Sequence, residues 1–144
     1  GGGLIGGIAS FLDARRSGVE VVGCQPENSA VMAASVAAGR ILELPSKPTL
    51  SDGTAGGVEA DTITFGPCRT MVSRFDLVSE AEIEAGMRRA YRDERLVIEG
   101  SAGVAIASAI RQAERLHGRS VAVVLCGGNV DLAAIPKLLA IAQG

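Results

Sequence analysis

The sequence predicts a three-layer α/β fold, in which a mostly parallel sheet carries helices on both faces. Short β-branched runs alternate along the chain with longer helical patterns, the order that is typical of parallel strands joined by helices. The run at residues 120–125 is apolar on both faces, as expected for a central parallel strand. With 144 residues, of which 47% are hydrophobic, the chain is long enough to bury a core, and residues 1–144 are predicted to form a single domain.

Strands and helices alternate in the following order. Strands are expected from β-branched or apolar runs at residues 19–24, 75–78 and 120–125. Helices are expected from spacing and capping residues at residues 8–12, 30–38, 80–95, 101–115 and 132–142. Residues 41–57 contain two prolines and three glycines, so this stretch is expected to be mostly loop.

Local signals fix several helix ends. Ser29 is a candidate N-cap and Gly39 a candidate C-terminal glycine for the second helix. Ser79 and Glu82 have the spacing of a capping box. Asp131 is expected to cap the last helix. The helix expected at residues 101–115 begins with a nearly continuous run of small residues, which allows it to lie close to a sheet or to a cofactor.

Composition excludes several classes of function. The net charge is −2, without a basic stripe, and aromatic residues make up only 3% of the chain, so a nucleic-acid surface is not expected. No apolar run reaches about 18 residues, and no membrane association is expected. The three cysteines are widely spaced and odd in number, which indicates reduced thiols and a cytoplasmic location. His117 is the only histidine, and no metal site is predicted.

Three short loops are expected at the carboxyl ends of the strands. They are the glycine-rich opening at residues 1–7, the Ser51-Asp52-Gly53 loop and the Cys126-Gly127-Gly128-Asn129 turn. Ligands of open α/β sheets bind at this edge. The shared location therefore predicts one composite site.

The glycine-rich opening is the first candidate binding element. Backbone N–H groups before a helix attract phosphate, and glycine lets the backbone approach an anion closely. Two alternatives stay open. Gly1, Gly3 and Gly6 also match the G-x-G-x-x-G spacing of dinucleotide sites, with Glu20 or Glu27 as the acidic residue. The glycines could also be flexible residues at an end of the chain, although Leu4-Ile5 and Ile8-Ala9 continue smoothly into an amphipathic helix.

The other two loops carry single residues of interest. Cys126 follows the last predicted strand, where a thiol can bond weakly to a ring nitrogen without carrying charge; a small buried core residue is the alternative. Glu99 precedes a helix, where it could face a ligand or complement the helix dipole. Gly53 lies in a polar loop, for which a simple turn is the default interpretation.

Four motifs together resemble a known family. They are GGGLIGGIA at residues 1–9, TLSDG at 49–53, IEGSAG at 98–103 and VLCGGNVD at 124–131. Their order and spacing are similar to those in the C-terminal half of fold-type II pyridoxal-phosphate enzymes, most of all the serine/threonine dehydratases and serine racemase. The resemblance covers essentially the whole chain and implies part of the large domain of the tryptophan synthase β-like fold.

The resemblance implies a set of cofactor-binding residues. Gly1, Gly2, Gly3 and Leu4 would offer N–H groups to the phosphate of pyridoxal 5'-phosphate. Cys126 would face the pyridine nitrogen. The Gly53 carbonyl, Glu99 and Asn129 would lie near the ring or the substrate. The implied reaction is a lyase reaction of amino-acid metabolism, in which L-threonine or L-serine loses its β-hydroxyl and yields a 2-oxo acid and ammonia. Racemase activity within the same family is an alternative.

The sequence departs from the family pattern at two points. Some members bind a divalent cation through an acidic residue where this chain has Gln25, with Val31 nearby, so no metal is expected. The Schiff-base lysine of the family lies upstream of the glycine loop, and neither Lys47 nor Lys137 lies in a matching motif. The chain is therefore predicted to contain no catalytic lysine, to be inactive alone, and to belong to an enzyme that forms homodimers and acts on a small hydroxy amino acid.

Overall fold

The computed structural model describes residues 1–130, so the predicted cap at Asp131 and the predicted helix at residues 132–142 lie outside the described residues. Eight longer elements and two 3₁₀ turns follow one another along the chain. They are α1 (Gly3–Ala14), β1 (Val22–Pro26), η1 (Glu27–Ser29), α2 (Val31–Ala38), η2 (Asp52–Thr54), α3 (Phe65–Met71), β2 (Arg74–Val78), α4 (Glu80–Glu94), α5 (Gly100–Arg111) and α6 (Ala113–Leu116).

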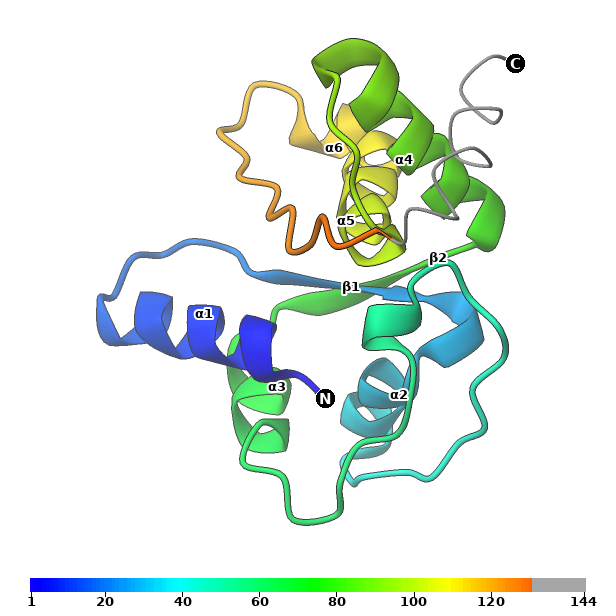
Figure 1. The fold of residues 1–144 in the computed structure, drawn as a ribbon. Helices are drawn as coiled ribbons and strands as arrows, with labels where there is room; N and C mark the ends of the chain where they lie inside the picture. Colours follow the sequence, from blue (N-terminus) through cyan, green and yellow to red (C-terminus); the bar gives the residue numbers. More distant parts are fainter. Residues whose placement is uncertain (131–144) are drawn as a thin grey trace.

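The two strands form the middle layer. β1 and β2 pair in parallel, with a register that runs from Val22 opposite Arg74 to Pro26 opposite Val78. Figure 1 shows α1, α2 and α3 on one side of this pair and α4, α5 and α6 on the other. The arrangement is the predicted three-layer α/β fold with a parallel sheet and helices on both faces.

Each helical layer has its own apolar core. On the α4–α5 side, the buried cluster contains eight side chains, namely Val78, Ile83, Met87, Ala90, Ile98, Ala102, Val104 and Ala107. On the α2–α3 side it contains Val31, Met32, Val58 and Cys68. The small residues at the front of α5 are expected to bring it close to a sheet or a cofactor; the contact found at Gly103 is with the helix α4, because a Cβ there would lie 2.7 Å from Met87 Cγ.

A polar contact is buried between β2 and α5. Ser108 Oγ donates to Asp76 Oδ2 at 2.7 Å, and Arg74 Nε pairs with the other carboxylate oxygen at 3.2 Å. This satisfies a carboxylate that would otherwise be costly to bury. Cys24 lies beside the pair, and desolvation by burial raises the pKa of its thiol.

Three arginines surround Glu20, which lies two residues before β1. Arg74, Arg115 and Arg119 all pair with the carboxylate of Glu20. These arginines come from β2, from α6 and from the turn after α6. The contacts tie the segment before β1 to two other parts of the fold.

The bounds of α2, β2 and α4 agree with the prediction to within one residue, whereas other bounds differ. The predicted N-cap of α2 is wrong, because Ala30 takes that position and Ser29 lies in η1. α2 ends at Ala38 with Gly39 at φ 69°, as predicted, whereas α1 already begins at Gly3, so most of the glycine run is helical. The first strand is displaced toward Pro26, and the helix predicted at residues 101–115 is divided into α5 and α6.

The third predicted strand is wrong for the described residues. Residues 120–130 carry no strand, and Val121, Val123, Val124 and Leu125 are 39–49% exposed. A strand is defined by its hydrogen-bonded neighbour, and the sheet of residues 1–130 contains only β1 and β2. Apolar patterning indicates that a segment suits a buried strand but cannot supply that neighbour.

The predicted capping box of α4 is present. Ser79 Oγ accepts from the N–H of Glu82, and the Glu82 carboxylate accepts from the N–H of Ser79 at 2.7 Å. The hydrogen bond from the Ser79 backbone is the main reason why the pKa of Glu82 is lowered. Within residues 1–130, no helix is both long and apolar enough to cross a membrane.

We expect Ser79→Ala to lower the free energy of unfolding by about 1 kcal/mol, because one N–H group of the first turn loses its acceptor. Urea unfolding followed by circular dichroism at neutral pH measures the loss. Ser73→Ala is the matched control, because Ser73 is exposed and its side chain makes no hydrogen bond within residues 1–130. Equal stability of the two variants would contradict the role of the box. The ionised Glu82 carboxylate also contributes to the free energy of unfolding. This contribution is present above the ordinary pKa of a glutamate carboxyl and is lost as the pH falls through the lowered pKa of Glu82.

Candidate functional site

The loop between α2 and α3 lies across the carboxyl ends of both strands. At the end of β1, Asn28 Nδ2 donates to the carbonyl of Pro48 at 2.7 Å. At the end of β2, Glu80 Oε2 accepts from the N–H of Leu50 at 2.7 Å. The Ser51–Gly53 motif is therefore at the edge of the sheet where the sequence predicts the site.

The N-terminus of α5 packs directly against this loop. A Cβ at Gly100 would overlap the carbonyl of Leu50, so the two backbones touch only because residue 100 is glycine. The approach brings the neighbouring Glu99 to the loop, and a Cβ at Gly53 would lie 3.8 Å from Glu99 Oε1. Two of the predicted site residues, Gly53 and Glu99, are thus close together.

Gly127 completes this group. The N–H of Glu99 donates to the carbonyl of Gly127 at 3.2 Å, and a Cβ at Gly127 would overlap the Glu99 carboxylate. Ser101 Oγ donates to Glu99 Oε1 at 2.6 Å. We refer to Gly53, Glu99, Ser101 and Gly127 as the Glu99 cluster. It joins three motifs that are far apart in the sequence.

The backbone at the start of α1 forms the second part of the candidate site. The first backbone bond of the helix runs from Gly6 N–H to the Gly2 carbonyl at 2.8 Å, so the N–H groups of the preceding turn have no acceptor within the helix. Gly2 adopts φ 79°, a left-handed conformation that glycine takes without strain. No acidic side chain lies in the first turn. A positive helix end of this kind fits a phosphate.

Side chains from two helices hold this backbone in place. Thr64 Oγ1 donates to the Gly1 carbonyl at 2.5 Å, and the Cys68 thiol lies 3.9 Å from the Gly2 carbonyl. Met32 packs against the same backbone, since a Cβ at Gly2 would lie 2.8 Å from Met32 Cε. The sequence analysis missed these residues, because no local pattern links them to the glycines.

The segment that follows β1 contacts both the loop of the Glu99 cluster and the start of α1. Gly56, at the end of the Ser51–Gly53 loop, donates its N–H to Ser29 Oγ at 3.1 Å. Ser29 directly precedes the region of α2 that carries Met32, the residue against Gly2. The end of β1 thus supports both groups.

Cys126 and Asn129 make no side-chain hydrogen bond to the Glu99 cluster among residues 1–130. Both side chains are exposed, and neither makes a hydrogen bond to another of residues 1–130. Cys126 immediately precedes Gly127 and so lies next to the Glu99 cluster in the chain. The structure thus brings Gly53 and Glu99 together, places Gly1–Leu4 at a helix start, and leaves the roles of Cys126 and Asn129 as predictions.

Gln25 is engaged in protein contacts. Its Oε1 accepts from the N–H of Ala33 at 2.8 Å, and its Nε2 lies 3.5 Å from the carbonyl of Ser29. The side chain therefore satisfies one of the free N–H groups in the first turn of α2. In the described part of the chain, no group of three or more His, Cys, Asp or Glu residues could hold a metal ion.

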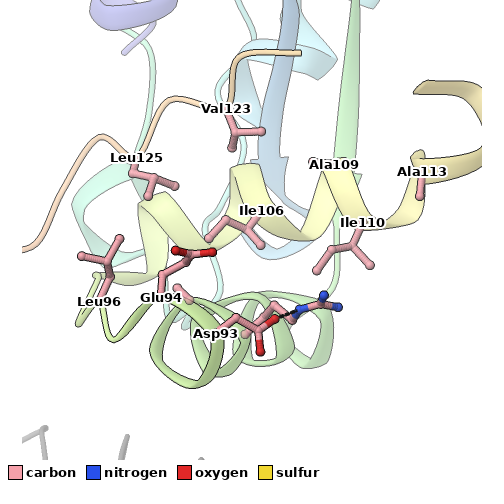
Figure 2. A pocket seen from close by; sticks show the side chains of 11 residues that line it. Asp93, Glu94, Leu96, Ile106, Ala109, Ile110, Ala113, Val123 and Leu125 are labelled. Atoms are coloured by element: carbon pink, nitrogen blue, oxygen red, sulfur yellow. Dashed lines mark hydrogen bonds and ion pairs between the residues drawn. The ribbon is translucent and has the colours of Figure 1, made fainter. Parts of the chain in front are cut away.

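Lys47, Glu20 and an apolar groove beside α4 and α5 all lie outside the candidate site. Lys47 is exposed on the loop, and Glu20 is paired with arginines. A groove of about 560 Å³ lies between α4, α5 and the segment that carries Val123 and Leu125. Figure 2 shows the side chains that line it. No predicted cofactor residue lines this groove.

Comparison with known proteins identifies relatives of this chain. A putative threonine dehydratase of Sinorhizobium fredii is 38% identical over 133 residues, which are 92% of this chain and 40% of the relative. The processed form of threonine deaminase isoform 2 from Solanum lycopersicum is 29% identical with a TM-score of 0.85, over 99% of this chain and 40% of that one. Maize serine racemase is 29% identical with a TM-score of 0.84, over 97% and 44%.

The chain thus spans less than half the length of these proteins. A family model described as "Pyridoxal-phosphate dependent enzyme" matches residues 1–127, which include the glycine start, the Ser51–Gly53 loop and the Glu99 cluster. The match favours pyridoxal phosphate over the dinucleotide alternative. The chain belongs to the pyridoxal-phosphate-dependent enzyme family and has the fold of its type II members.

Proposed function

We propose that this chain supplies the phosphate-binding and ring-facing part of a lyase that removes the β-hydroxyl group from L-threonine or L-serine. The products are a 2-oxo acid and ammonia. The observation that carries the proposal is the pair of connected groups, a helix start suited to phosphate and the Glu99 cluster, in a chain with threonine dehydratase relatives. When bound, pyridoxal phosphate supplies the electron sink for the elimination.

The first group fits the phosphate end of the cofactor. The N–H groups of Gly2, Gly3 and Leu4 precede or begin α1, and Thr64 and Cys68 hold the backbone that presents them. Gly1 is exposed, so its backbone is open to the same ligand. Backbone donors and the helix dipole bind phosphate without a charged side chain.

The second group fits the ring and substrate end. Gly53 lies beside the Glu99 carboxylate, since a Cβ at Gly53 would lie 3.8 Å from Glu99 Oε1, and we propose that the Gly53 carbonyl and this carboxylate both approach the ring or the substrate. Cys126 would approach the pyridine nitrogen as a neutral, weak donor, and Asn129 would help to shape the floor of the site. A neutral partner at that nitrogen suits β-elimination better than transamination.

The catalytic lysine is proposed to lie in a part of the enzyme that this chain does not span. Lys47 is exposed on the loop between α2 and α3 and lies in none of the four motifs. Lys137 lies outside the described residues. The proposal includes the expectation that residues 1–144 alone are inactive and that the whole enzyme forms homodimers in the cytoplasm.

Racemisation of serine is the second candidate, favoured by the likeness to maize serine racemase. Both reactions begin with loss of the α-proton of the same substrate. They differ in whether the β-hydroxyl then leaves or a proton returns on the opposite face.

The deciding experiment uses the full-length enzyme with added pyridoxal phosphate. We expect a visible absorbance band that disappears after borohydride treatment, and release of a 2-oxo acid from L-threonine or L-serine. Formation of D-serine without 2-oxo acid would favour the racemase. Failure to acquire the band would overturn the proposal, and 2-oxo acid formation by residues 1–144 alone would overturn the expected absence of a catalytic lysine.

We expect Gly2→Ala to weaken pyridoxal-phosphate binding by roughly tenfold, because a left-handed alanine costs about 1–2 kcal/mol and its Cβ would crowd Met32 and Cys68. Equilibrium dialysis of the full-length enzyme measures the affinity. Gly7→Ala is the matched control, since it lies in the same helix with open space around it. Equal affinities of the two variants would argue against a phosphate site at the start of α1.

We expect Gln25→Glu to introduce a response to divalent cations. The substitution keeps an acceptor for the N–H of Ala33 but places a carboxylate oxygen near the carbonyl of Ser29. Repulsion between these oxygens lowers the melting temperature, and a bound Mg²⁺ or Ca²⁺ would offset it. Thermal unfolding with and without the cation measures the effect, with Gln25→Ala as the control. A cation effect of the same size in wild type and both variants would refute this prediction.

A further inference from the structure

We infer that Ser101 is a positioning residue that holds the carboxylate of Glu99 at the cofactor site. The inference rests on the proposed function, because it assigns Glu99 a place next to the cofactor ring. It concerns a residue that lies two positions after Glu99, inside the first turn of α5. The resemblance to the family does not include a role for this serine.

The geometry couples the two side chains closely. Ser101 is buried, with 8% of its surface exposed, and its hydroxyl donates to Glu99 Oε1 at 2.6 Å. A hydrogen bond to an ionised acceptor is shorter and stronger than one between neutral groups. The hydroxyl has a single proton, so this bond uses the whole donor capacity of the Ser101 side chain.

The Glu99 side chain does not act as a helix cap. Glu99 is the N-cap residue of α5, yet its side chain accepts no capping hydrogen bond. The N–H groups of Ala102 and Gly103 instead donate to the backbone carbonyl of Glu99, each at 3.1 Å. The carboxylate thus takes no part in capping the free N–H groups of α5. Ser101 directs it elsewhere.

The Glu99 carboxylate is directed toward the predicted site. The carboxylate lies over the backbone of Gly127, where a Cβ would overlap it, and a Cβ at Gly53 would lie 3.8 Å from Oε1. The N–H of Glu99 is fixed at the same time by the carbonyl of Gly127. Both the backbone and the side chain of Glu99 are therefore held, and Ser101 supplies the side-chain contact.

The test compares two alanine variants in the full-length enzyme loaded with pyridoxal phosphate. Ser101→Ala removes the contact to Glu99. Ser108→Ala is the matched control, because Ser108 lies in the same helix, is buried, and donates to a carboxylate oxygen of Asp76 at 2.7 Å. Each variant thus loses one buried serine–carboxylate bond, and only Ser101 contacts the proposed site.

We expect Ser101→Ala to lower kcat by roughly tenfold or more with little change in KM, in line with the loss of one hydrogen bond to a charged group. We also expect a shifted pH profile of kcat and a shifted absorbance maximum of the bound cofactor. Ser108→Ala should show wild-type kinetics and spectrum, although both variants should lose thermal stability. Ser101→Thr, which restores a hydroxyl, should recover the wild-type spectrum.

A double substitution tests whether Ser101 acts through Glu99. If it does, adding Ser101→Ala to Glu99→Gln should lower kcat less than Ser101→Ala does alone in the wild type. Additive effects, or the same changes in Ser101→Ala and Ser108→Ala, would overturn the inference. The wild-type enzyme separates the two proposals. If the wild-type enzyme shows no cofactor band, the proposed function is overturned. If the wild-type enzyme is active and Ser101→Ala has the same kinetics and spectrum, only the positioning role is overturned.

Discussion

The close approach of Gly100 to the carbonyl of Leu50 is the constraint on which the candidate site depends. Any side chain at residue 100 would overlap that carbonyl, so α5 would have to move away from the loop that crosses the strand ends. Glu99 would move with it, since it directly precedes the first residue of α5. The contact of Glu99 with Gly127 would then be lost as well. One missing Cβ thus allows three motifs to meet.

The opposite side of the same loop is held by polar contacts to both strands. Asn28 and Ser29 follow β1, and Glu80 follows β2, and all three bind backbone or side-chain groups of residues 46–56. A loop of this length would pay a large entropy cost if it were ordered by its own contacts alone. Anchoring to the strand ends lowers that cost and gives Gly53 a defined position.

Local chemistry explains which features could be predicted from the sequence. The capping box at Ser79 and Glu82 and the left-handed end at Gly39 each depend on a few neighbouring residues, and both are present. The fold class follows from the alternation of patterns along the chain. The strand at residues 120–125 could not be judged in this way, because a strand requires a neighbour and local hydrophobicity does not reveal whether one is present.

The site shows the same limit more sharply. Gly53 and Glu99 could be named from their motifs, but Thr64, which holds Gly1 from 63 positions away, has no signal in its own neighbourhood. Ser101 was expected only to begin a helix, whereas the structure begins α5 at Gly100 and gives the Ser101 hydroxyl a different partner. Side-chain partners across such distances are set by the packing of whole elements.

Several contacts that define the site are made by backbone atoms, so the side chains around them can vary. The bond from Glu99 N–H to Gly127, the bond from Lys47 N–H to Asn28 and the contact between Gly100 and Leu50 all use main-chain atoms. Such contacts survive most substitutions of the surrounding side chains, provided that the glycines remain. The surface of the domain can therefore diverge widely while the geometry at the strand ends is retained. Substitutions at Gly100 and Gly127 are the exception, because there a single methyl group must displace another part of the site.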